Sequence, residues 1–259
     1  MPLRIYSEEE ARPLSKVKSV LAVAAGKGGV GKSTITVNLA LAFAQLGVKV
    51  GILDADIYGP SVCTLLPVEQ KPSQKNDVLY PGRAKNIEIM TMGFFRQEGQ
   101  AAAVRAPIAN SVVRQFIENV RWGSLDVLLI DFPPGTGDIQ LTLCQKAQVT
   151  QAVLVTTPQA LAVADVKKAI DLFRQVAVPL AGVVENMSTY QGTPLFGEGG
   201  GEELAHSYQV PLLGKIPLDP LLCRCSDRGE SILETDPLSP ACQPFLDIAS
   251  QLIPKEVVK

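Results

Sequence analysis

One glycine-rich stretch constrains the fold of this chain more than any other part. Residues 26–34 read Gly-Lys-Gly-Gly-Val-Gly-Lys-Ser-Thr and fit the phosphate-loop pattern G-x-x-x-x-G-K-[ST]. The apolar run 19–25 before it is typical of a buried strand, and residues 33–46 after it are typical of a helix. A chance glycine-rich turn would rarely satisfy both the pattern and this context. The stretch therefore predicts a nucleotide site in an α/β fold.

The residues of this loop have separate roles in such a site. Glycines let successive backbone N–H groups point inward around a phosphate, and the following helix adds its positive N-terminal end. Lys32 would reach the terminal phosphates, and the hydroxyl of Ser33 would bind Mg²⁺. The predicted contacts of ATP are Gly26, Lys27, Gly28, Gly29, Val30, Gly31, Lys32, Ser33 and Thr34.

Two groups of carboxylates are expected beside the loop because each closes a buried strand. The run 49–54 leads into Asp54 and Asp56, and the run 126–131 ends at Asp131. Open parallel sheets bind their ligands at the carboxyl ends of the strands. Asp131 therefore has the form of a carboxylate that lies near the metal of a nucleotide site. The alternative is an aspartate that only closes a strand.

A loop rich in proline and glycine follows Asp131 directly. Residues 132–138 read Phe-Pro-Pro-Gly-Thr-Gly-Asp. The prolines stiffen the start of this segment, and the glycines leave its middle free. The N–H group of Gly135 could therefore turn toward a γ-phosphate and leave after hydrolysis. The segment predicts a switch loop.

The rest of the chain alternates between strand-like and helix-like segments. Strands are expected at 86–92, 151–157, 180–186 and 211–216, and helices at 108–120, 159–176 and 240–252. This order predicts a doubly wound, mostly parallel sheet flanked by helices. We expect one domain, 19–259, after a flexible N-terminal arm, 1–18. Residues 57–82 suggest a long excursion beside the site.

Composition limits the classes of function. The chain has 259 residues, of which 46% are hydrophobic, so it can bury a sizeable core. A formal net charge of -2 gives no overall attraction to nucleic acid or anionic lipid. No apolar run approaches the ~20 residues that a membrane-spanning helix needs. Five cysteines without a disulfide framework fit a reducing compartment. We therefore expect a cytoplasmic protein that binds neither nucleic acid nor membrane.

The lysine directly after the first glycine is not required by an ordinary phosphate loop. The sequence Lys-Gly-Gly-Val-Gly-Lys-Ser-Thr resembles the deviant Walker A loop of the MinD, ParA and nitrogenase-iron-protein superclass of P-loop NTPases. That resemblance implies an ATP-dependent homodimer in which Lys27 contacts the nucleotide of the partner subunit. A cation at that place stabilises the charge that develops during phosphoryl transfer. It thus implies catalytic roles for Lys27 and Lys32.

Longer segments restrict the resemblance to one family within this superclass. The segments at 51–61, 131–142, 156–159, 184–188 and 196–200 resemble the Mrp/ApbC family of iron–sulfur cluster carrier ATPases. The likeness extends from about residue 17 to residue 252. It implies a slow, Mg-dependent ATPase whose dimer changes shape and passes an iron–sulfur cluster to apo client proteins.

The same resemblance implies roles for single residues. Asp56 corresponds to the aspartate that orients the attacking water, and we interpret Asp54 as its support. The magnesium site would be formed by Ser33, Asp56 and Asp131. The adenine contacts would be Asn186, Pro217 and Asp219. For Asn186 the alternative is an asparagine that only closes a turn.

One departure from the family concerns the cluster. The family holds it with a C-x-x-C from each subunit, but residues 189–195, where that motif belongs, contain no cysteine. Iron–sulfur clusters need four thiolates, or histidines in place of some. Cys223 and Cys225 form the only close thiol pair, and two copies across a two-fold axis would supply four sulfurs. The alternative is that both are ordinary packing residues.

The sequence therefore leaves two functions open. The first is an ATPase of iron–sulfur cluster assembly or transfer, with a cluster that bridges the dimer. The second is a cluster-free nucleotide switch of the MinD or ParA type that positions a partner protein or a cell structure. The presence of bound iron and sulfide distinguishes them.

Overall fold

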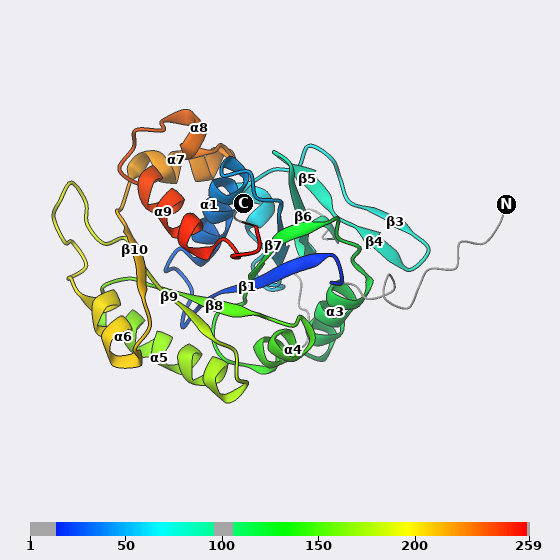
Figure 1. Cartoon of the computed structure of the whole chain (residues 1–259), viewed down its shortest axis with the longest axis horizontal. Coiled ribbons are helices and arrows are strands. Elements are labelled where there is room, and N and C mark those ends of the chain that lie inside the picture. Colours follow the sequence, from blue (N-terminus) through cyan, green and yellow to red (C-terminus); the bar gives the residue numbers. More distant parts are fainter. Residues whose placement is uncertain (1–13, 96–105, 258–259) are drawn as a thin grey trace.

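A parallel sheet forms the centre of the molecule (Figure 1). The computed structural model describes residues 14–95 and 106–257. Within them, the strand order of the main sheet is β10-β9-β8-β1-β7-β2-β6-β5, and all neighbours are parallel except β5 and β6. The strands are β1 (Val17–Ala25), β2 (Val50–Asp54), β5 (Gly82–Ala84), β6 (Ile87–Thr91), β7 (Leu125–Asp131), β8 (Gln151–Thr156), β9 (Leu180–Asn186) and β10 (Leu212–Ile216). The predicted doubly wound, mostly parallel sheet is confirmed.

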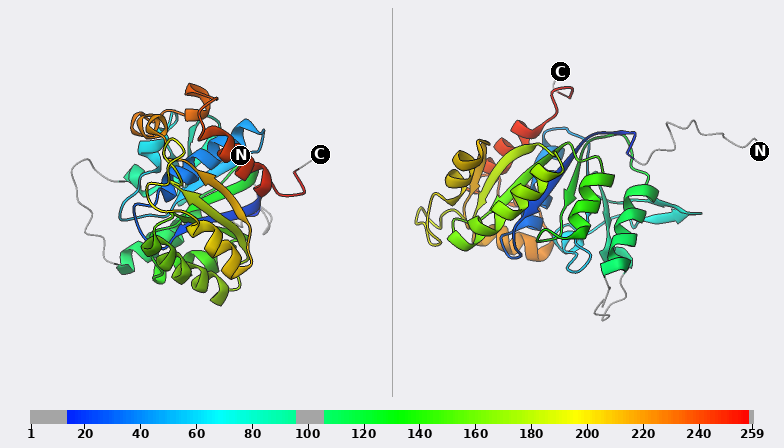
Figure 2. Two further views of the ribbon diagram at one scale, coloured as in Figure 1. Left: turned by 90° about the vertical axis from the view of Figure 1, so that its left-hand side faces the viewer. Right: turned by 90° about the horizontal axis from the view of Figure 1, so that it is seen from below.

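Helices cover both faces of this sheet (Figure 2). One face packs against α1 (Lys32–Gln45), α2 (Val62–Leu65), α7 (Pro220–Arg228), α8 (Ile232–Thr235) and α9 (Cys242–Leu252). The other packs against α3 (Ala106–Asn119), α4 (Asp138–Lys146), α5 (Ala160–Gln175) and α6 (Gly200–Tyr208). A short 3-10 turn, η1 (Met92–Phe95), follows β6, and a separate hairpin consists of β3 (Ser73–Lys75) and β4 (Val78–Tyr80). Among the described residues, no helix has both the length and the apolar character that crossing a membrane requires.

The central strands are apolar on both faces because both faces are covered. In β1, Leu21 and Val23 belong to the core beneath α1, whereas Val20 and Ala22 belong to the core beneath α5. All seven residues of β7 are buried. This two-sided burial explains why the strands read as continuous apolar runs rather than as alternating patterns.

Several elements differ from the sequence-based expectations. Strand β1 begins at Val17, two residues inside the predicted arm, and arm residues 1–13 lie outside the described residues. The excursion at 57–82 contains α2 and the β3–β4 hairpin. Helix α4 begins at Asp138, the last residue of the predicted switch loop, and α6 and α7 had not been expected. Helix α7 does carry a start signal, because Asp219 caps it and Pro220 is its first residue.

The register of the strands brings the candidate site together. Asp131 at the end of β7 lies opposite Val23 of β1 on one side and Asp54 of β2 on the other. The phosphate loop leaves the same edge of the sheet, between β1 and α1. The two strand-end carboxylates and the loop therefore share one edge, as the sequence predicted.

Gly26, the first glycine of the loop, also packs closely against helix α5. A Cβ atom at Gly26 would lie 2.1 Å from the carbonyl carbon of Asp165 and 2.4 Å from the backbone nitrogen of Val166, both in α5. Backbone atoms of a packed helix cannot yield as a side chain can. A Cβ atom at Gly28, by contrast, would meet no atom within 4 Å.

Gly26→Ala is therefore expected to lower the free energy of unfolding by about 3 kcal/mol or more, at or above the upper end of typical overpacking costs. Gly28→Ala is the matched control and should change it by less than about 1 kcal/mol, the scale of an ordinary glycine-to-alanine change. Chemical denaturation without nucleotide measures both. Equal stability of the two variants would contradict the close approach of α5.

Candidate nucleotide and metal site

The phosphate loop has the backbone conformations that its glycines allow. Gly29 and Gly31 have φ angles of +83° and +86°, a region that residues with side chains rarely adopt. Gly31 is the N-cap of α1, so Lys32 and Ser33 are the first residues of that helix. Their side chains therefore begin at the positive end of the helix dipole, where an anion is favoured.

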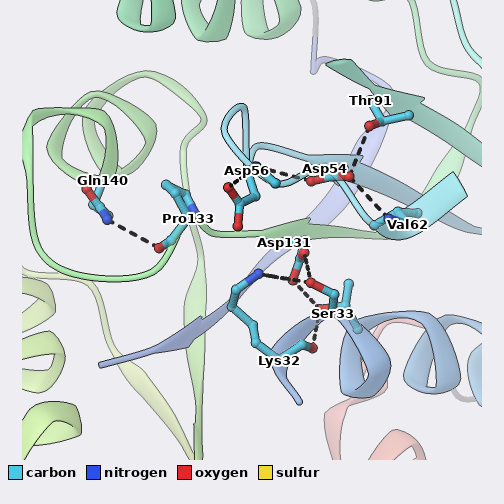
Figure 3. Close-up of polar contacts among 11 residues, drawn as sticks. Lys32, Ser33, Asp54, Asp56, Val62, Thr91, Asp131, Pro133 and Gln140 are labelled. Atoms are coloured by element: carbon cyan, nitrogen blue, oxygen red, sulfur yellow. Dashed lines mark hydrogen bonds and ion pairs between the residues drawn. The ribbon is translucent and has the colours of Figure 1, made fainter. Parts of the chain in front are cut away.

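Asp131 connects the loop to the sheet through three short contacts (Figure 3). Its Oδ1 atom lies 2.7 Å from Nζ of Lys32 and accepts a 2.7 Å hydrogen bond from the hydroxyl of Thr36. Its Oδ2 atom accepts a 2.6 Å hydrogen bond from the hydroxyl of Ser33. The Asp131 side chain is fully buried, and that of Lys32 is 8% exposed. The structure thus brings together the predicted phosphate-binding lysine, the predicted metal-binding hydroxyl and the predicted metal-binding carboxylate.

This arrangement fits a magnesium ion by the chemistry of its donors. Mg²⁺ prefers oxygen ligands, and at phosphate sites it takes one or two protein groups together with phosphate and water oxygens. Ser33 and Asp131 offer such a pair, already in contact. Among residues 14–95 and 106–257, no cluster of three or more His, Cys, Asp or Glu side chains could hold a metal without such help. The site therefore suits a metal that arrives with a nucleotide.

Asp54 is a second buried carboxylate beside the first. It accepts hydrogen bonds from the hydroxyl of Thr91 (3.0 Å) and from the backbone N–H groups of Val62 (3.3 Å) and Asp56 (3.1 Å). Burial, together with the negative charge of Asp131, raises the pKa of Asp54 to about 7 despite these hydrogen bonds. Asp54 thereby holds the start of the loop that carries Asp56, which agrees with the supporting role expected from the sequence.

Asp56 itself is only partly buried and lies in the loop after β2. Its Oδ1 atom accepts a 3.1 Å hydrogen bond from the N–H group of Gly59. Its other carboxylate oxygen has no hydrogen bond within the described part of the chain. Asp56 is thus ordered by its own loop, and its role toward water or metal stays a prediction.

The predicted switch loop is closed by Gln140, which was not among the residues predicted from the sequence. The side-chain amide of Gln140 donates to the carbonyl oxygens of Pro133 (3.2 Å) and Pro134 (3.0 Å), and its oxygen accepts from the N–H group of Gly137 (2.8 Å). Gly135, between these contacts, has a φ angle of +95°. A glutamine three residues after a helix N-cap can bond back to the cap, and that spacing was the available signal.

The predicted adenine contacts lie in two different environments. The Asn186 side chain, at the end of β9, donates a 2.9 Å hydrogen bond to the carbonyl oxygen of Val30 in the phosphate loop. Asp219 accepts a 2.7 Å bond from the N–H group of Leu221 and a short one from the hydroxyl of Ser239, so both oxygens stabilise the start of α7. Pro217 is half-buried before that helix. Contact of these residues with adenine stays a prediction.

The predicted cysteine pair does not share a face. Cys223 is exposed and Cys225 is 2% exposed in the core, because residues two apart on a helix point about 200° apart. The other described cysteines, Cys63, Cys144 and Cys242, pack in or against the two cores. Burial raises the pKa of the Cys63 thiol to about 12, with a further contribution from Asp54, and that of Cys144 to about 11. Neither is a ready thiolate for iron.

Because the pKa of Asp54 is raised, the free energy of unfolding should fall as the pH rises. Between the ordinary value of 3.8 and about 7, the folded chain binds a proton that the unfolded chain does not. The contribution of Asp54 to stability is therefore fully present below pH 3.8 and is lost as the pH rises to about 7. Without nucleotide or metal, the wild-type chain should lose stability relative to Asp54→Asn across this window. Urea denaturation at several pH values measures this difference, and parallel pH profiles would contradict it.

The comparisons with known proteins agree with this site. The family model described as NUBPL iron-transfer P-loop NTPase matches residues 16–253. Curated relatives named iron–sulfur cluster carrier protein include one from Aquifex aeolicus, 44% identical over 91% of this chain and 67% of its own length. Another, from Synechocystis, is 41% identical over 95% of this chain and 73% of its own length.

Solved structures show the same relationship. A nucleotide-binding protein from Archaeoglobus fulgidus, in complex with ADP, is 36% identical and superposes with a TM-score of 0.74 over 97% of this chain and 98% of its own. The cell division ATPase MinD from Pyrococcus furiosus, 22% identical, shares the fold with a TM-score of 0.68 over 90% of this chain and 98% of its own. The chain therefore belongs to the NUBPL iron-transfer P-loop NTPase family of the ParA type, and it shares the fold of MinD.

Proposed function

We propose that this chain is a Mg-dependent ATPase that acts as a homodimer in the assembly or transfer of iron–sulfur clusters. The observation that carries the ATPase part is the buried contact of Lys32, Ser33 and Asp131 at the start of α1. The names of the relatives, iron–sulfur cluster carrier protein, support the second part. ADP in the Archaeoglobus relative supports a nucleotide in the same loop.

The site changes its internal contacts when a nucleotide enters. The β- and γ-phosphates attract the Lys32 ammonium away from Asp131, and the N–H groups of the loop surround them. Ser33 and Asp131 are the residues that would hold Mg²⁺, which neutralises phosphate charge and supports the leaving group. Asp56 would orient the attacking water, and Gly135 would donate its N–H group to the γ-phosphate. Lys27 of the partner would stabilise the charge that develops.

The first test removes the lysine that contacts Asp131. Lys32→Ala should weaken ATP binding at least about 100-fold or abolish it, since a charge-assisted contact to phosphate is lost from a site with little water. Lys168→Ala is the control, because this lysine lies on the exposed face of α5 and pairs with Asp165. Titration calorimetry with ATP and Mg²⁺ measures both variants. Unchanged ATP affinity in Lys32→Ala would refute the site.

The second test concerns Lys27. Lys27→Ala should leave ATP affinity within a few-fold of wild type but lower turnover at least about tenfold, because a cation used only in the transition state affects kcat. Lys27→Arg keeps the charge and should retain more activity. Phosphate release gives turnover, and analytical ultracentrifugation gives the oligomeric state. Full turnover by a strict monomer would rule out the role in the partner's site.

The cluster must be held differently from the C-x-x-C of the family. Residues 189–195 have no cysteine, and a short β-bridge joins Tyr190 to Thr193 there. Exposed Cys223 from each subunit supplies two thiolates, so the remaining ligands would come from a client protein or a small thiol. Buried Cys225 is not suited to this task.

The missing motif also favours a second candidate function, a cluster-free nucleotide switch of the MinD or ParA type that positions a partner protein. Iron and acid-labile sulfide per dimer, after anaerobic reconstitution with a small thiol, distinguish the two. For the carrier we expect a cluster in wild type, its loss in Cys223→Ser and its retention in Cys225→Ser. A wild-type chain without iron would contradict the carrier function and favour the switch.

A further inference from the structure

The loop between β7 and α4 is held by a single buried side chain. Gln140, which is 5% exposed, donates from Nε2 to the carbonyl oxygens of Pro133 (3.2 Å) and Pro134 (3.0 Å). Across residues 133–136, these are the only backbone hydrogen bonds to other described residues. The shape of this part of the loop therefore depends on the two amide hydrogens of Gln140.

These two contacts go beyond what a helix cap needs. Gln140 is the third residue of α4, and its Oε1 atom accepts a 2.8 Å hydrogen bond from the N–H group of the N-cap residue, Gly137. That contact is half of a capping box, and it uses only an acceptor oxygen, so glutamate would serve it equally well. The Nε2 atom instead reaches residues that precede the cap. Only an amide supplies both the acceptor and the donors.

The contact with Pro134 fixes the direction of the next N–H group, that of Gly135. The Pro134 carbonyl and the Gly135 N–H belong to one peptide unit, and every peptide bond in the described residues is trans. In a trans peptide these two groups point in opposite directions. Because the Pro134 oxygen points toward Gln140, the Gly135 N–H points away from it. Figure 3 shows Gln140 on one side of Pro133 and Asp56 on the other.

The loop has little else that could hold this direction. The two prolines have no N–H group to donate. Gly135 has a φ angle of +95°, and glycine can leave this conformation for several others at low cost. A Cβ atom at Gly135 would lie 3.9 Å from Nε2 of Gln140, so the amide lies directly against this turn. Without its donors, the peptide between Pro134 and Gly135 would be free to rotate.

We propose that Gln140 is a positioning residue for ATP hydrolysis, whose amide donors direct the Gly135 N–H group toward the γ-phosphate. This inference rests on the proposed ATPase function. ADP lacks the γ-phosphate, so its binding does not use this N–H group. Loss of the Gln140 donors should therefore lower turnover and the preference for a nucleotide with a γ-phosphate, while the affinity for ADP stays unchanged.

Gln140→Glu separates positioning from capping. It keeps the shape of the side chain and the acceptor for Gly137, but an ionised carboxylate cannot donate to the proline carbonyls. Turnover, measured as phosphate release, should fall at least about tenfold, which is less than the ~100-fold cost of deleting a transition-state donor itself. ADP affinity, measured by calorimetry, should stay within about threefold of wild type and so shows that the variant is folded.

Two further variants complete the comparison. Gln140→Leu removes the cap contact together with the donors and should lose as much turnover as Gln140→Glu, since the donors are the groups that matter. Gln145→Leu makes the same change at an exposed glutamine of α4 and is the matched control, which should behave as wild type does.

A measurement without hydrolysis gives a second readout. With Mg²⁺, wild type should bind the non-hydrolysable analogue AMP-PNP more tightly than ADP, and Gln140→Glu should lose most of this preference. Full turnover and full preference in Gln140→Glu would overturn the inference, because Gln140 would then only cap α4. Loss of ADP affinity together with turnover would also overturn it. A wild-type chain that does not hydrolyse ATP would instead contradict the proposed function, and this inference with it.

Discussion

The buried carboxylate of Asp131 is the constraint on which the candidate site depends. It lies at the end of a strand that is buried along its whole length. Within the described residues, its hydrogen bonds and its ion pair all come from the first turns of α1. Moving a charged group from water into a protein interior costs several kcal/mol of free energy unless ion pairs or hydrogen bonds compensate the charge. Lys32, Ser33 and Thr36 provide that compensation here. The same contacts join the start of α1, directly after the phosphate loop, to the end of β7.

This dependence also explains how nucleotide binding can change the molecule. In the proposed mechanism Lys32 cannot contact Asp131 and the phosphates equally well, so a nucleotide would replace one strong contact of Lys32 by another. Asp54 lies next to Asp131 in the sheet, and burial together with the charge of Asp131 raises its pKa. A second negative charge at this edge of the sheet is therefore unfavourable. A divalent cation at the proposed metal site would reduce the repulsion between these two carboxylates. Asp54 in turn anchors the loop of Asp56, and Gln140 closes the loop of Gly135. Both loops that would sense the γ-phosphate are thus attached to the same edge.

Much of the fold could be predicted from sequence because its strands are buried on both faces and its loop has a rigid chemical pattern. Strand-end carboxylates could be placed at one edge before the register between Asp54 and Asp131 was known. The predictions failed where the structure depends on contacts that the local sequence does not specify. Gln140 acts through the carbonyl groups of two prolines, which no spacing rule specifies, and the close approach of α5 to Gly26 joins distant segments. Cys223 and Cys225 looked like a pair in sequence, but a helix separates their directions.

The most direct test of this account is the affinity for ADP of wild type and Asp131→Asn, each measured by calorimetry with and without Mg²⁺. If Asp131 both holds Lys32 when no nucleotide is bound and contributes to the metal site, Asp131→Asn should bind ADP without metal at least as tightly as wild type. It should also lose the gain in affinity that Mg²⁺ gives the wild-type chain. A variant that keeps the full effect of Mg²⁺ would contradict the account, because Asp131 would then be only the end of a strand.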